Sequence, residues 1–478
     1  MLATPLLPEI LLAIVGMSLL MVGVFSGDRI AKPMCYAVAV SLIGALFVGF
    51  VAPAGPAFGG LFVADKLASF AKTLIVIGAA ATAIMAAGRS VAADGVGPMR
   101  FEQPVLMLFA ALGMMLMVSA NDLISLYIGL ELQSLSLYVL AAIRRDSLRA
   151  TEAGLKYFVL GALSSGMLLY GAGLIYGYTG STGFDAIHSR VLDMGQPSLG
   201  LVVGIVFLLA GLAFKVSAAP FHMWVPDVYE GSDTPITAFF AAAPKAAALA
   251  LFARVMSDPL SGADQAWGQI VSVIAGLSVV IGALGALAQR NIKRLLAYSS
   301  IGHVGFALIG LAAASEAGVR SLLIYSAVYL FMTLAAFACV MAMRRGGRAV
   351  ETIDDLAGAS RTHPMMAFGL AAVMFSMAGI PPLAGFFGKL YVLGAAVESG
   401  LYLLAVVGVL ASVVSCFYYI RIIKLMYFDE ATDALDGPMP KDLGIVLAIA
   451  SIIILFFIVL PGPIVSQASL AAQELFQN

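Results

Sequence analysis

The chain has 478 residues, of which 62% are apolar and only 11% are charged, and its net charge is −1. Soluble proteins carry about 25% charged residues, so this composition excludes a soluble enzyme and predicts a protein embedded in a lipid bilayer. The sequence contains no basic patch that would indicate a nucleic-acid partner.

In chain order, the apolar residues form fourteen segments, each of which is long enough to cross a bilayer, since about 17 to 25 residues suffice. The segments lie near residues 5–24, 32–52, 67–87, 103–119, 121–143, 153–178, 199–229, 236–256, 266–288, 298–314, 319–343, 364–397, 401–428 and 443–463. The first has no basic region before it and no small-residue cleavage site after it, so we expect a spanning helix and not a removed signal peptide. Because the connections are short, the predicted fold is an all-α polytopic membrane protein with about 14 transmembrane helices.

The basic residues are distributed unevenly between the two sets of connections. Fifteen follow odd-numbered segments: Arg29, Lys32, Arg89, Arg100, Arg144, Arg145, Arg149, Arg290, Lys293, Arg294, Arg344, Arg345, Arg348, Arg361 and Lys441. Only Lys66, Arg190 and Arg320 follow even-numbered segments. Because cytoplasmic connections hold the excess of Lys and Arg, both termini are predicted to lie on the non-cytoplasmic side.

Four charged residues lie well inside apolar segments, namely Glu131, Lys215, Lys245 and Lys389. A charge at the centre of a spanning helix costs roughly 2.5 to 3.5 kcal/mol, so four would cost on the order of 10 kcal/mol, comparable to the stability of a whole domain. We therefore expect a polar interior, in which a lysine binds and releases a proton as a carboxylate approaches or retreats. The alternative is a static buried pair of Glu131 with Lys215 that only fixes helix packing.

Two of the segments that contain a lysine are also interrupted by proline: Pro220 in FKVSAAPFHMW, and Pro381 with Pro382 in GIPPLAGFFGKL. The backbone groups that proline frees are tolerated at membrane depth only inside protein or along a wet cavity. The two breaks are about 160 residues apart, which is also the spacing between the fourth and ninth segments. This pattern predicts two inverted five-helix repeats, each with a broken helix, an arrangement typical of transport pathways.

The predicted repeats divide the chain into four parts. Residues 1–102 would form three transmembrane helices, 103–265 the first five-helix repeat, 266–430 the second, inverted repeat, and 431–478 a C-terminal transmembrane helix.

Three further polar residues are candidates for proton transfer: His303, which joins the four charged residues as a main candidate, and the weaker candidates Lys156 and His222. Lys156 lies near the start of its helix, where it either reaches toward the headgroups or takes part in function. His303 lies in the tenth segment and His222 follows Pro220, and each either relays protons or is a hydrogen-bonded packing residue. The cations near helix ends that are expected to reach the headgroups are Lys72, Arg254, Arg421 and Lys424.

No metal or redox-cofactor site is predicted in this chain. Cys35, Cys339 and Cys416 fall in separate apolar segments, and the histidines show no H-x-x-x-H spacing, so neither an iron–sulfur cluster nor a zinc site is indicated. The sequence also lacks the G-x-G-x-x-G fingerprint of dinucleotide-binding folds and a haem attachment motif.

The stretches that carry these residues resemble the signature segments of the antiporter-like subunits of respiratory complex I. They read YIGLELQSLSLYVL, LKYFVLGALSSG, FKVSAAPFHMWVPDVYEGSDTPITAFFAAAPKAAALA, NIKRLLAYSSIGHVGF and GIPPLAGFFGKLYV, and the resemblance covers about residues 103–430. Three details indicate one type of subunit within this family. No long lateral helix is predicted after the fourteenth segment, Lys389 stands where another type has a glutamate, and the glutamate helix reads LELQSLSLY.

The resemblance implies a membrane-arm subunit of a proton-translocating NADH:quinone oxidoreductase. Glu131 would pair with Lys215, Lys245 would pass a proton toward His303, and Lys389 would connect to the opposite side of the membrane. The resemblance implies no cofactor in this chain, because NADH, FMN, iron–sulfur clusters and quinone would be bound by partner subunits. Its partners would be the peripheral and the other membrane-arm subunits, including other antiporter-like ones, in the lipid bilayer of a bacterial inner membrane.

Two other functions are compatible with the sequence. The chain could belong to a multi-subunit Na+/H+ antiporter or a membrane-bound hydrogenase built on the same helices, which neighbouring genes for redox or antiporter subunits would distinguish. A stand-alone secondary carrier would instead need a polar pocket at the helix breaks, where the sequence has mostly Ala, Gly and Phe.

Overall fold

Nearly all of the apolar segments form helices, because a helix satisfies its backbone hydrogen bonds internally when it is surrounded by lipid. The computed structural model describes residues 4–88, 99–430 and 435–477. The helices of the first half are α1 (Leu7–Ser26), α2 (Ala31–Val51), α3 (Lys66–Ala87), α4 (Glu102–Val118), α5 (Leu123–Ala141), α6 (Leu148–Thr179), α7 (Phe184–Met194), α8 (Leu199–Val216), α9 (Trp224–Gly231), α10 (Thr234–Ala241) and α11 (Ala243–Ser257).

The second half continues the same architecture. Its helices are α12 (Asp264–Leu287), α13 (Ile292–Ala312), α14 (Glu316–Ala342), α15 (Ala359–Thr362), α16 (Pro364–Ala378), α17 (Ala384–Glu398), α18 (Tyr402–Phe428), α19 (Lys441–Phe456) and α20 (Gly462–Gln477). Two small antiparallel hairpins lie in connections, one of β1 (Gly55–Ala57) with β2 (Phe62–Ala64) and one of β3 (Arg344–Arg345) with β4 (Arg348–Ala349).

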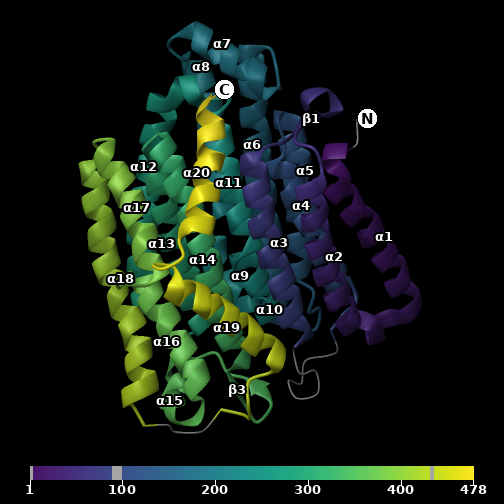
Figure 1. Cartoon of the computed structure of the whole chain (residues 1–478), viewed down its shortest axis with the longest axis vertical. Coiled ribbons are helices and arrows are strands. Elements are labelled where there is room, and N and C mark those ends of the chain that lie inside the picture. Colours follow the sequence, from purple (N-terminus) through teal and green to yellow (C-terminus); the bar gives the residue numbers. More distant parts are fainter. Residues whose placement is uncertain (1–3, 89–98, 431–434, 478) are drawn as a thin grey trace.

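The connections gather at two ends of a helical bundle (Figure 1). β1, α7 and both chain ends lie toward the top of Figure 1, whereas β3 and α15 lie at the bottom. A bridge between Asp122 and Gly183 brings the start of α5 to the α7 end, so the connection from α5 to α6 lies at the other end, together with β3. Most of the basic connections lie at this second end, which we call the basic end; Arg89 lies outside the described residues.

The structure confirms both proline breaks and corrects two other segments. Within the described residues, ten stretches are long and apolar enough to cross a membrane, and α4 and α16 are shorter apolar helices. The expected continuous helix 236–256 is wrong, because it divides into α10 and α11 at Ala242. The last segment ends early, at Phe456, and an unpredicted helix, α20, follows it. The number of membrane crossings, the inverted repeat and the four-part division stay predictions.

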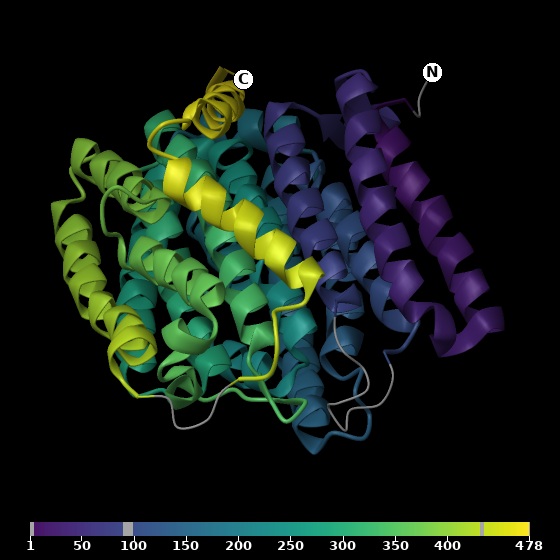
Figure 2. The same cartoon turned by 60° about the horizontal axis from the view of Figure 1, so that its bottom comes forward.

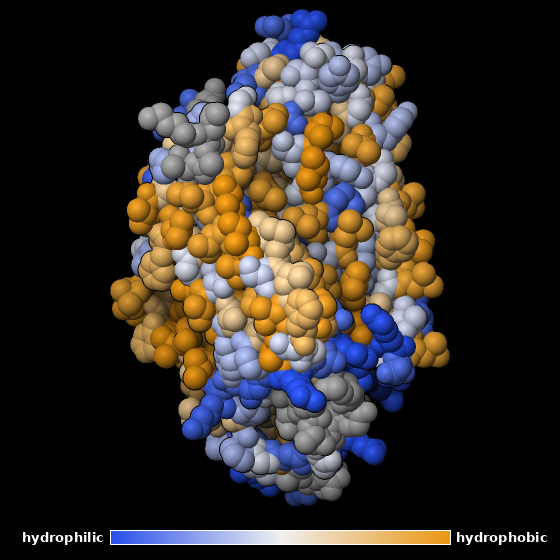
Figure 3. Space-filling view, turned by 90° about the vertical axis from the view of Figure 1, so that its right-hand side faces the viewer, coloured by the Kyte–Doolittle hydropathy of each residue, from blue (hydrophilic) through white to orange (hydrophobic). Residues whose placement is uncertain are grey.

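The outer surface of the bundle is suited to lipid. In Figure 3, hydrophobic side chains form a broad band across the middle of the face that includes α1, and hydrophilic side chains gather toward its ends. Large apolar side chains on the outer helices are strongly exposed, for example Phe25 (83%), Val51 (87%) and Leu403 (81%). Because such side chains are costly to leave in water, they support the prediction of a multi-pass membrane protein.

The centre of the bundle is formed by α10, α11 and α14, whose most apolar windows are fully buried. Figure 2 shows α19 crossing this central region obliquely, and Figure 1 shows α20 continuing from it toward the end that carries α7. Both helices contact α14 and α3. The C-terminal helices therefore cover the central helices on one side, and the buried charges described below lie inside the protein rather than against lipid.

Two cations that were expected to reach the headgroups are instead buried in ion pairs. Lys72 of α3 contacts Glu9 of α1, with 2.7 Å between Nζ and Oε1. Arg254 of α11 contacts Asp65 at the start of α3, with 2.7 Å between Nη1 and Oδ2, and its Nε donates to the Val118 carbonyl. The prediction was wrong for both because each cation has a carboxylate from a distant part of the chain within ion-pair distance. The other two cations of this group differ: the Lys424 side chain is 64% exposed, and the Arg421 side chain is 36% exposed.

We expect Arg254→Ala to destabilise the protein by about 3 kcal/mol, because it leaves Asp65, whose side chain is only 13% exposed, without its cation. The melting temperature of the purified assembly and the amount of the chain in the membrane would measure this loss. Arg421→Ala is the matched control, since its ion pair with Asp354 is long (4.0 Å) and exposed, and it should change stability by no more than about 1 kcal/mol. Equal stability of the two variants would contradict a structural role for the Arg254 pair.

Candidate functional site

The first helix break follows directly after Lys215. α8 ends at Val216, Ser217 adopts a left-handed backbone conformation (φ 70°), and Pro220 lies within the irregular stretch before α9. The backbone N–H of Ala219 donates to Ser278 Oγ of α12 over 2.8 Å, so a neighbouring helix satisfies a group that the break frees. Lys215 lies in the last turn of α8, where the helix dipole stabilises a cation.

Hydroxyl groups connect Lys215 to Glu131. The Lys215 ammonium donates to Ser134 Oγ (2.7 Å), to Tyr138 OH (3.4 Å) and to Ser165 Oγ (3.5 Å). Ser165 in turn donates to Glu131 Oε1 over 2.5 Å. No ion pair within 4.0 Å joins Glu131 to Lys215 in the described part of the chain, so the expected direct pair is replaced by a bridge through Ser165. Because a hydroxyl both donates and accepts, this bridge can pass a proton between the two charged groups.

Lys245 lies at the centre of the protein, in the first turn of α11, and is 1% exposed. Its Nζ donates to Ser300 Oγ of α13, which also accepts from Tyr329 OH of α14 (2.7 Å). No carboxylate lies within ion-pair distance of Lys245 among the described residues, and the helix N-terminus opposes a positive charge there. Lys245 is therefore surrounded by neutral hydrogen-bonding groups, in contrast to Lys215 with its nearby carboxylate.

His303 lies three residues after Ser300 on α13 and is also buried. Its Nδ1 lies 2.7 Å from Tyr325 OH of α14, and its Nε2 lies 3.1 Å from Tyr419 OH of α18. Tyr419 OH is also 2.5 Å from Ser299 Oγ. Both ring nitrogens of His303 thus have a phenol partner, and a neutral imidazole can accept a proton on one nitrogen while it gives up a proton from the other.

The second helix break holds Lys389. α16 ends at Ala378, Gly379 adopts a left-handed conformation (φ 88°), and α17 begins after Pro381 and Pro382. Lys389 of α17 reaches back to this end, where its Nζ donates to the Ala378 carbonyl (2.9 Å) and to Ser412 Oγ of α18 (2.8 Å). The exposed carbonyls at the end of α16 stabilise a cation, as the end of α8 does for Lys215.

The structure therefore brings three of the five main candidates, Lys245, His303 and Lys389, into one buried region. α13 carries both the Ser300 partner of Lys245 and His303, and the Lys389 Nζ lies 4.9 Å from the centre of the Phe306 ring, one turn beyond His303. Lys245, His303 and Lys389 are at most 6% exposed, so none of them reaches the headgroups. Glu131 and Lys215 form the partly buried first member of the series.

The hydroxyl partners were missed by the reasoning from sequence. Ser134 follows Glu131 by three residues, and Ser300 precedes His303 by three, so each pair shares one face of its helix. This spacing was the available signal for Ser134 and Ser300. The tyrosines of α14 and α18 lie on other helices, and only the folded structure shows that they reach His303.

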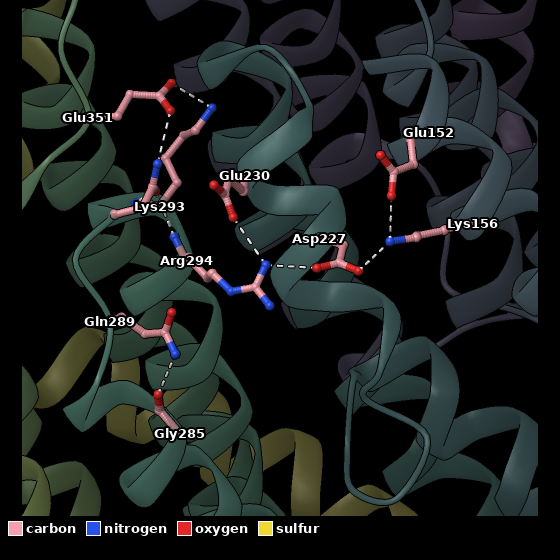
Figure 4. A network of polar contacts seen from close by, with 10 residues as sticks. Glu152, Lys156, Asp227, Glu230, Gly285, Gln289, Lys293, Arg294 and Glu351 are labelled. Carbon is pink, nitrogen blue, oxygen red and sulfur yellow. Dashed lines mark hydrogen bonds and ion pairs between the residues drawn. The ribbon is translucent and has the colours of Figure 1, made fainter. Parts of the chain in front are cut away.

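The two weaker candidates lie outside this series. Lys156 makes ion pairs with Glu152 and Asp227, each with an N–O distance of 2.7 Å, near the basic end (Figure 4). His222 lies in the first break, and its Nδ1 has no hydrogen-bond partner among the described residues.

The described residues contain no group of three or more His, Cys, Asp or Glu residues that could hold a metal ion. The chemistry this region can perform is the binding and transfer of protons.

Comparisons with known proteins agree with this chemistry. The family described as "NADH:quinone oxidoreductase/Mrp antiporter, TM" matches residues 120–415. "NADH-quinone oxidoreductase subunit N" of Paramagnetospirillum magneticum is 54% identical over 99% of this chain and 98% of its own length. A chain of respiratory complex I from Thermus thermophilus has a TM-score of 0.81 at 33% identity, over 97% of this chain and 100% of that chain. A chain of the Mrp complex from Dietzia has a TM-score of 0.84 over 98% of this chain and 97% of that chain, but at 22% identity it shows the fold alone.

Proposed function

Because this chain belongs to the family of antiporter-like membrane subunits of NADH:quinone oxidoreductase and Mrp antiporters, we infer that it works in the membrane arm of complex I and translocates protons. The relatives that support this inference are of the subunit N type, which the LELQSLSLY stretch and Lys389 had indicated. Proton translocation by this chain is coupled to the transfer of electrons from NADH to quinone in the assembled enzyme.

The observation that carries the proposal is the series of proton-binding groups along the middle of the protein. Glu131 and Lys215, bridged by Ser165, exchange a proton at the first break. Lys245 receives a proton from that region and passes it toward His303. Its hydrogen-bond partner Ser300 lies on α13, the helix that carries His303. Lys389 at the second break takes the proton from His303 and releases it toward the opposite side. Each lysine lies at an interruption of its helix, where polar backbone groups and water are tolerated.

The energy required fits this kind of device. Moving one proton against 100 mV costs about 2.3 kcal/mol. A change in the distance between a lysine and a carboxylate changes the proton affinity of both groups by amounts of this order. A small movement of the Glu131 and Lys215 side chains, which share Ser165 as a partner, is therefore sufficient to drive one transfer step.

Partner subunits supply the redox chemistry in this proposal. NADH, FMN, iron–sulfur clusters and quinone are bound by the peripheral and neighbouring membrane-arm subunits, and this chain acts as a non-redox translocase that they drive. Protons are its only cargo. The other antiporter-like subunits lie in the same membrane arm, and this chain contributes its own proton pathway beside theirs.

The proposed orientation places the basic end in the cytoplasm and both termini on the opposite side of a bacterial inner membrane. The distribution of Lys and Arg supports it. Figure 1 supports it as well, since the N and C labels lie toward the same end of the bundle, away from β3 and α15. Protons would thus enter from the basic end and leave toward the end that carries α7.

A subunit of a cation antiporter complex is the second candidate, because the family and the Dietzia structure include Mrp complexes. The two functions differ in their driving reaction. NADH oxidation by the purified assembly, with inhibition of proton transport when quinone reduction is blocked, would support the first. Sodium-dependent proton exchange without any NADH oxidation would support the second.

We expect Glu131→Gln to reduce NADH-driven proton transport by at least about tenfold, because glutamine keeps the hydrogen bond to Ser165 but cannot hold a charge beside Lys215. The quenching of a pH-sensitive dye by sealed membrane vesicles would measure transport, and the amount of assembled enzyme would be determined in the same sample. Glu398→Gln, at the exposed end of α17, is the control and should pump normally. Normal pumping by assembled Glu131→Gln enzyme would contradict the proposed role of the first break.

A further inference from the structure

Asp227 of α9 lies between two cations that belong to different helices. One carboxylate oxygen is 2.7 Å from Lys156 Nζ of α6, and the other is 2.7 Å from Arg294 Nη1 of α13 (Figure 4). α9 is the second half of the broken helix whose first half, α8, carries Lys215 in its last turn. A single carboxylate therefore joins this broken helix to the helix of Ser165 on one side and to the helix of His303 on the other.

Each of the two cations also has a second carboxylate. Lys156 contacts Glu152 on its own helix (2.7 Å), and Arg294 contacts Glu230 on α9 (3.0 Å). α9 is thus held to α13 by two ion pairs but to α6 by only one. If α6 and α9 separate, Lys156 keeps Glu152 and Asp227 keeps Arg294, so no charge loses its last partner. Of the two contacts that α9 makes through Asp227, the one with α6 can therefore open without leaving an unpaired charge.

A cavity of about 190 Å³ lies at this contact. Arg149, Glu152 and Lys156 of α6 line one side, and Asp227, Glu230 and Gly231 of α9 line the other. The cavity has room for several waters, and every charged side chain in its wall can hydrogen-bond to water. It lies near the basic end, because α6 begins there, directly after the connection that carries Arg144 and Arg145.

Aromatic side chains separate this cavity from Lys215. Tyr157, next to Lys156 in the chain, stacks on Trp224 at the start of α9, with 4.3 Å between ring centres. The Trp224 indole Nε1 donates to the carbonyl of Phe214, the residue before Lys215. Tyr157 also packs edge-on against Tyr138, whose hydroxyl accepts from Lys215. The Tyr157–Trp224 stack therefore lies between the charged cavity and the Glu131–Lys215 region, and contacts the neighbours of Lys215 on both sides.

We propose that the contact between α6 and α9 is a gate through which water and protons reach Lys215 from the basic end. The Lys156–Asp227 ion pair closes its outer part, and the stack of Tyr157 on Trp224 closes its inner part. Opening breaks the Lys156–Asp227 contact while Lys156 keeps Glu152 and Asp227 keeps Arg294, and water from the cavity then extends past the separated rings. This proposal rests on the proposed function, since it names the route by which that same site receives its protons.

A reversible covalent lock tests the gate. A Cβ atom on Gly231 would lie 2.7 Å from the Arg149 carbonyl oxygen and 2.8 Å from the Ala153 Cβ, so a side chain at Gly231 requires α9 to shift slightly away from α6. A disulfide requires about 3.5 to 4.5 Å between the two Cβ atoms, so the same shift brings Ala153→Cys and Gly231→Cys to bonding distance. Oxidation of the assembled double variant should abolish NADH-driven proton transport, and reduction of the same sample should restore it. The wild-type enzyme, with its three native cysteines, is treated identically.

The matched control locks α6 to a different neighbour. A Cβ on Gly204 of α8 would lie 3.0 Å from the Leu174 Cβ of α6, near the α7 end, so Leu174→Cys with Gly204→Cys places a similar cross-link far from the gate. This enzyme should pump equally well in its oxidised and reduced forms. Equal pumping by the oxidised and reduced forms of the Ala153/Gly231 variant would overturn the gate.

A second variant tests the gate without new cysteines. Asp227→Asn weakens the closed contact but leaves Lys156 with Glu152 and Arg294 with Glu230. A proton gradient built by NADH oxidation should then decay faster once oxidation is stopped with an inhibitor, and Asp227→Glu should restore the slow decay. A purely structural role would instead lower the amount of assembled enzyme and leave the decay per enzyme unchanged, which would contradict the proposal. If Glu131→Gln enzyme lost proton pumping but the cross-linked Ala153/Gly231 enzyme did not, the gate would be rejected and the proposed function would still stand.

Discussion

Lys215→Ala is expected to reduce NADH-driven proton transport by the assembled enzyme by at least about tenfold, within the range that one positioned proton-transfer group contributes. Lys215 is the group that connects Glu131, through Ser165, with the break between α8 and α9. Alanine removes the only ammonium in this region that contacts Ser134, Tyr138 and Ser165 among the described residues. The rate of acidification of sealed vesicles, divided by the amount of assembled enzyme, would measure the effect.

The control for this prediction is Lys424→Ala. Lys424 lies near the end of α18, its side chain is 64% exposed, and its ion pair is with Asp429 of the same end. Removing it changes the charge of the chain by the same amount but leaves the buried series intact. Pumping at the normal rate by Lys215→Ala, or an equal loss in both variants, would contradict the role given to Lys215.

Lys245→Ala is expected to reduce NADH-driven proton transport by at least about tenfold, as Lys215→Ala does, while the enzyme still assembles. Lys245 is fully enclosed, and no carboxylate forms an ion pair with it in the described structure, so its removal leaves no buried charge without a partner. Ser300 keeps its hydrogen bond from Tyr329. The first break and the His303 region would both remain intact, but the group that passes a proton between them would be missing.

Subunit composition and proton transport should be measured on the same Lys245→Ala preparation. Tyr329→Phe is a useful comparison, because it removes one hydrogen bond to Ser300 but keeps the lysine, and we expect a smaller loss of transport than in Lys245→Ala. If Lys245→Ala pumped as well as the wild type, protons would not pass through the centre of this chain. If it failed to assemble, Lys245 would have a structural role that its neutral surroundings do not explain.

The positions of the candidate functional groups could be predicted because a charged residue inside an apolar segment is energetically costly and therefore rare. Lys215, Lys245 and Lys389 stand out from apolar segments, and proline identifies the two breaks without any knowledge of the fold. The break at Ala242 was missed, although Pro244 in the first turn of α11 is a typical helix-start signal. A single proline inside a long apolar segment does not distinguish a bend from a new helix.

The partners of these groups could not be predicted, because they depend on which helices come into contact. Glu9 and Lys72 are sixty-three residues apart, and each alone resembles a charge near the membrane surface. The same holds for Asp65 with Arg254. The position of a residue along a helix gives the depth of its side chain in the membrane. Whether two side chains meet in a salt bridge also depends on how each helix is oriented about its own axis. A helix that is apolar on nearly all sides is only weakly amphipathic, so its sequence does not define that orientation.

The α20 helix was missed for a related reason. Residues 462–477 contain fewer apolar residues than the spanning segments and include Glu474, so they do not read as a helix in lipid. In the structure this helix lies against α3 and α14, and the Glu474 carboxylate accepts a hydrogen bond from the backbone N–H of Lys66 at 2.5 Å. Its contact with α3 and α14, rather than its own hydropathy, explains its position.

The number of protons transported per NADH oxidised tests most directly whether this chain carries protons itself. It should be measured with purified enzyme in sealed liposomes, where Lys215→Ala enzyme and wild-type enzyme have the same subunit composition. The account predicts that the variant transports fewer protons for each NADH that it still oxidises, because the pathway through this chain is closed. The wild-type ratio in the variant would show that protons do not cross the membrane by way of Lys215.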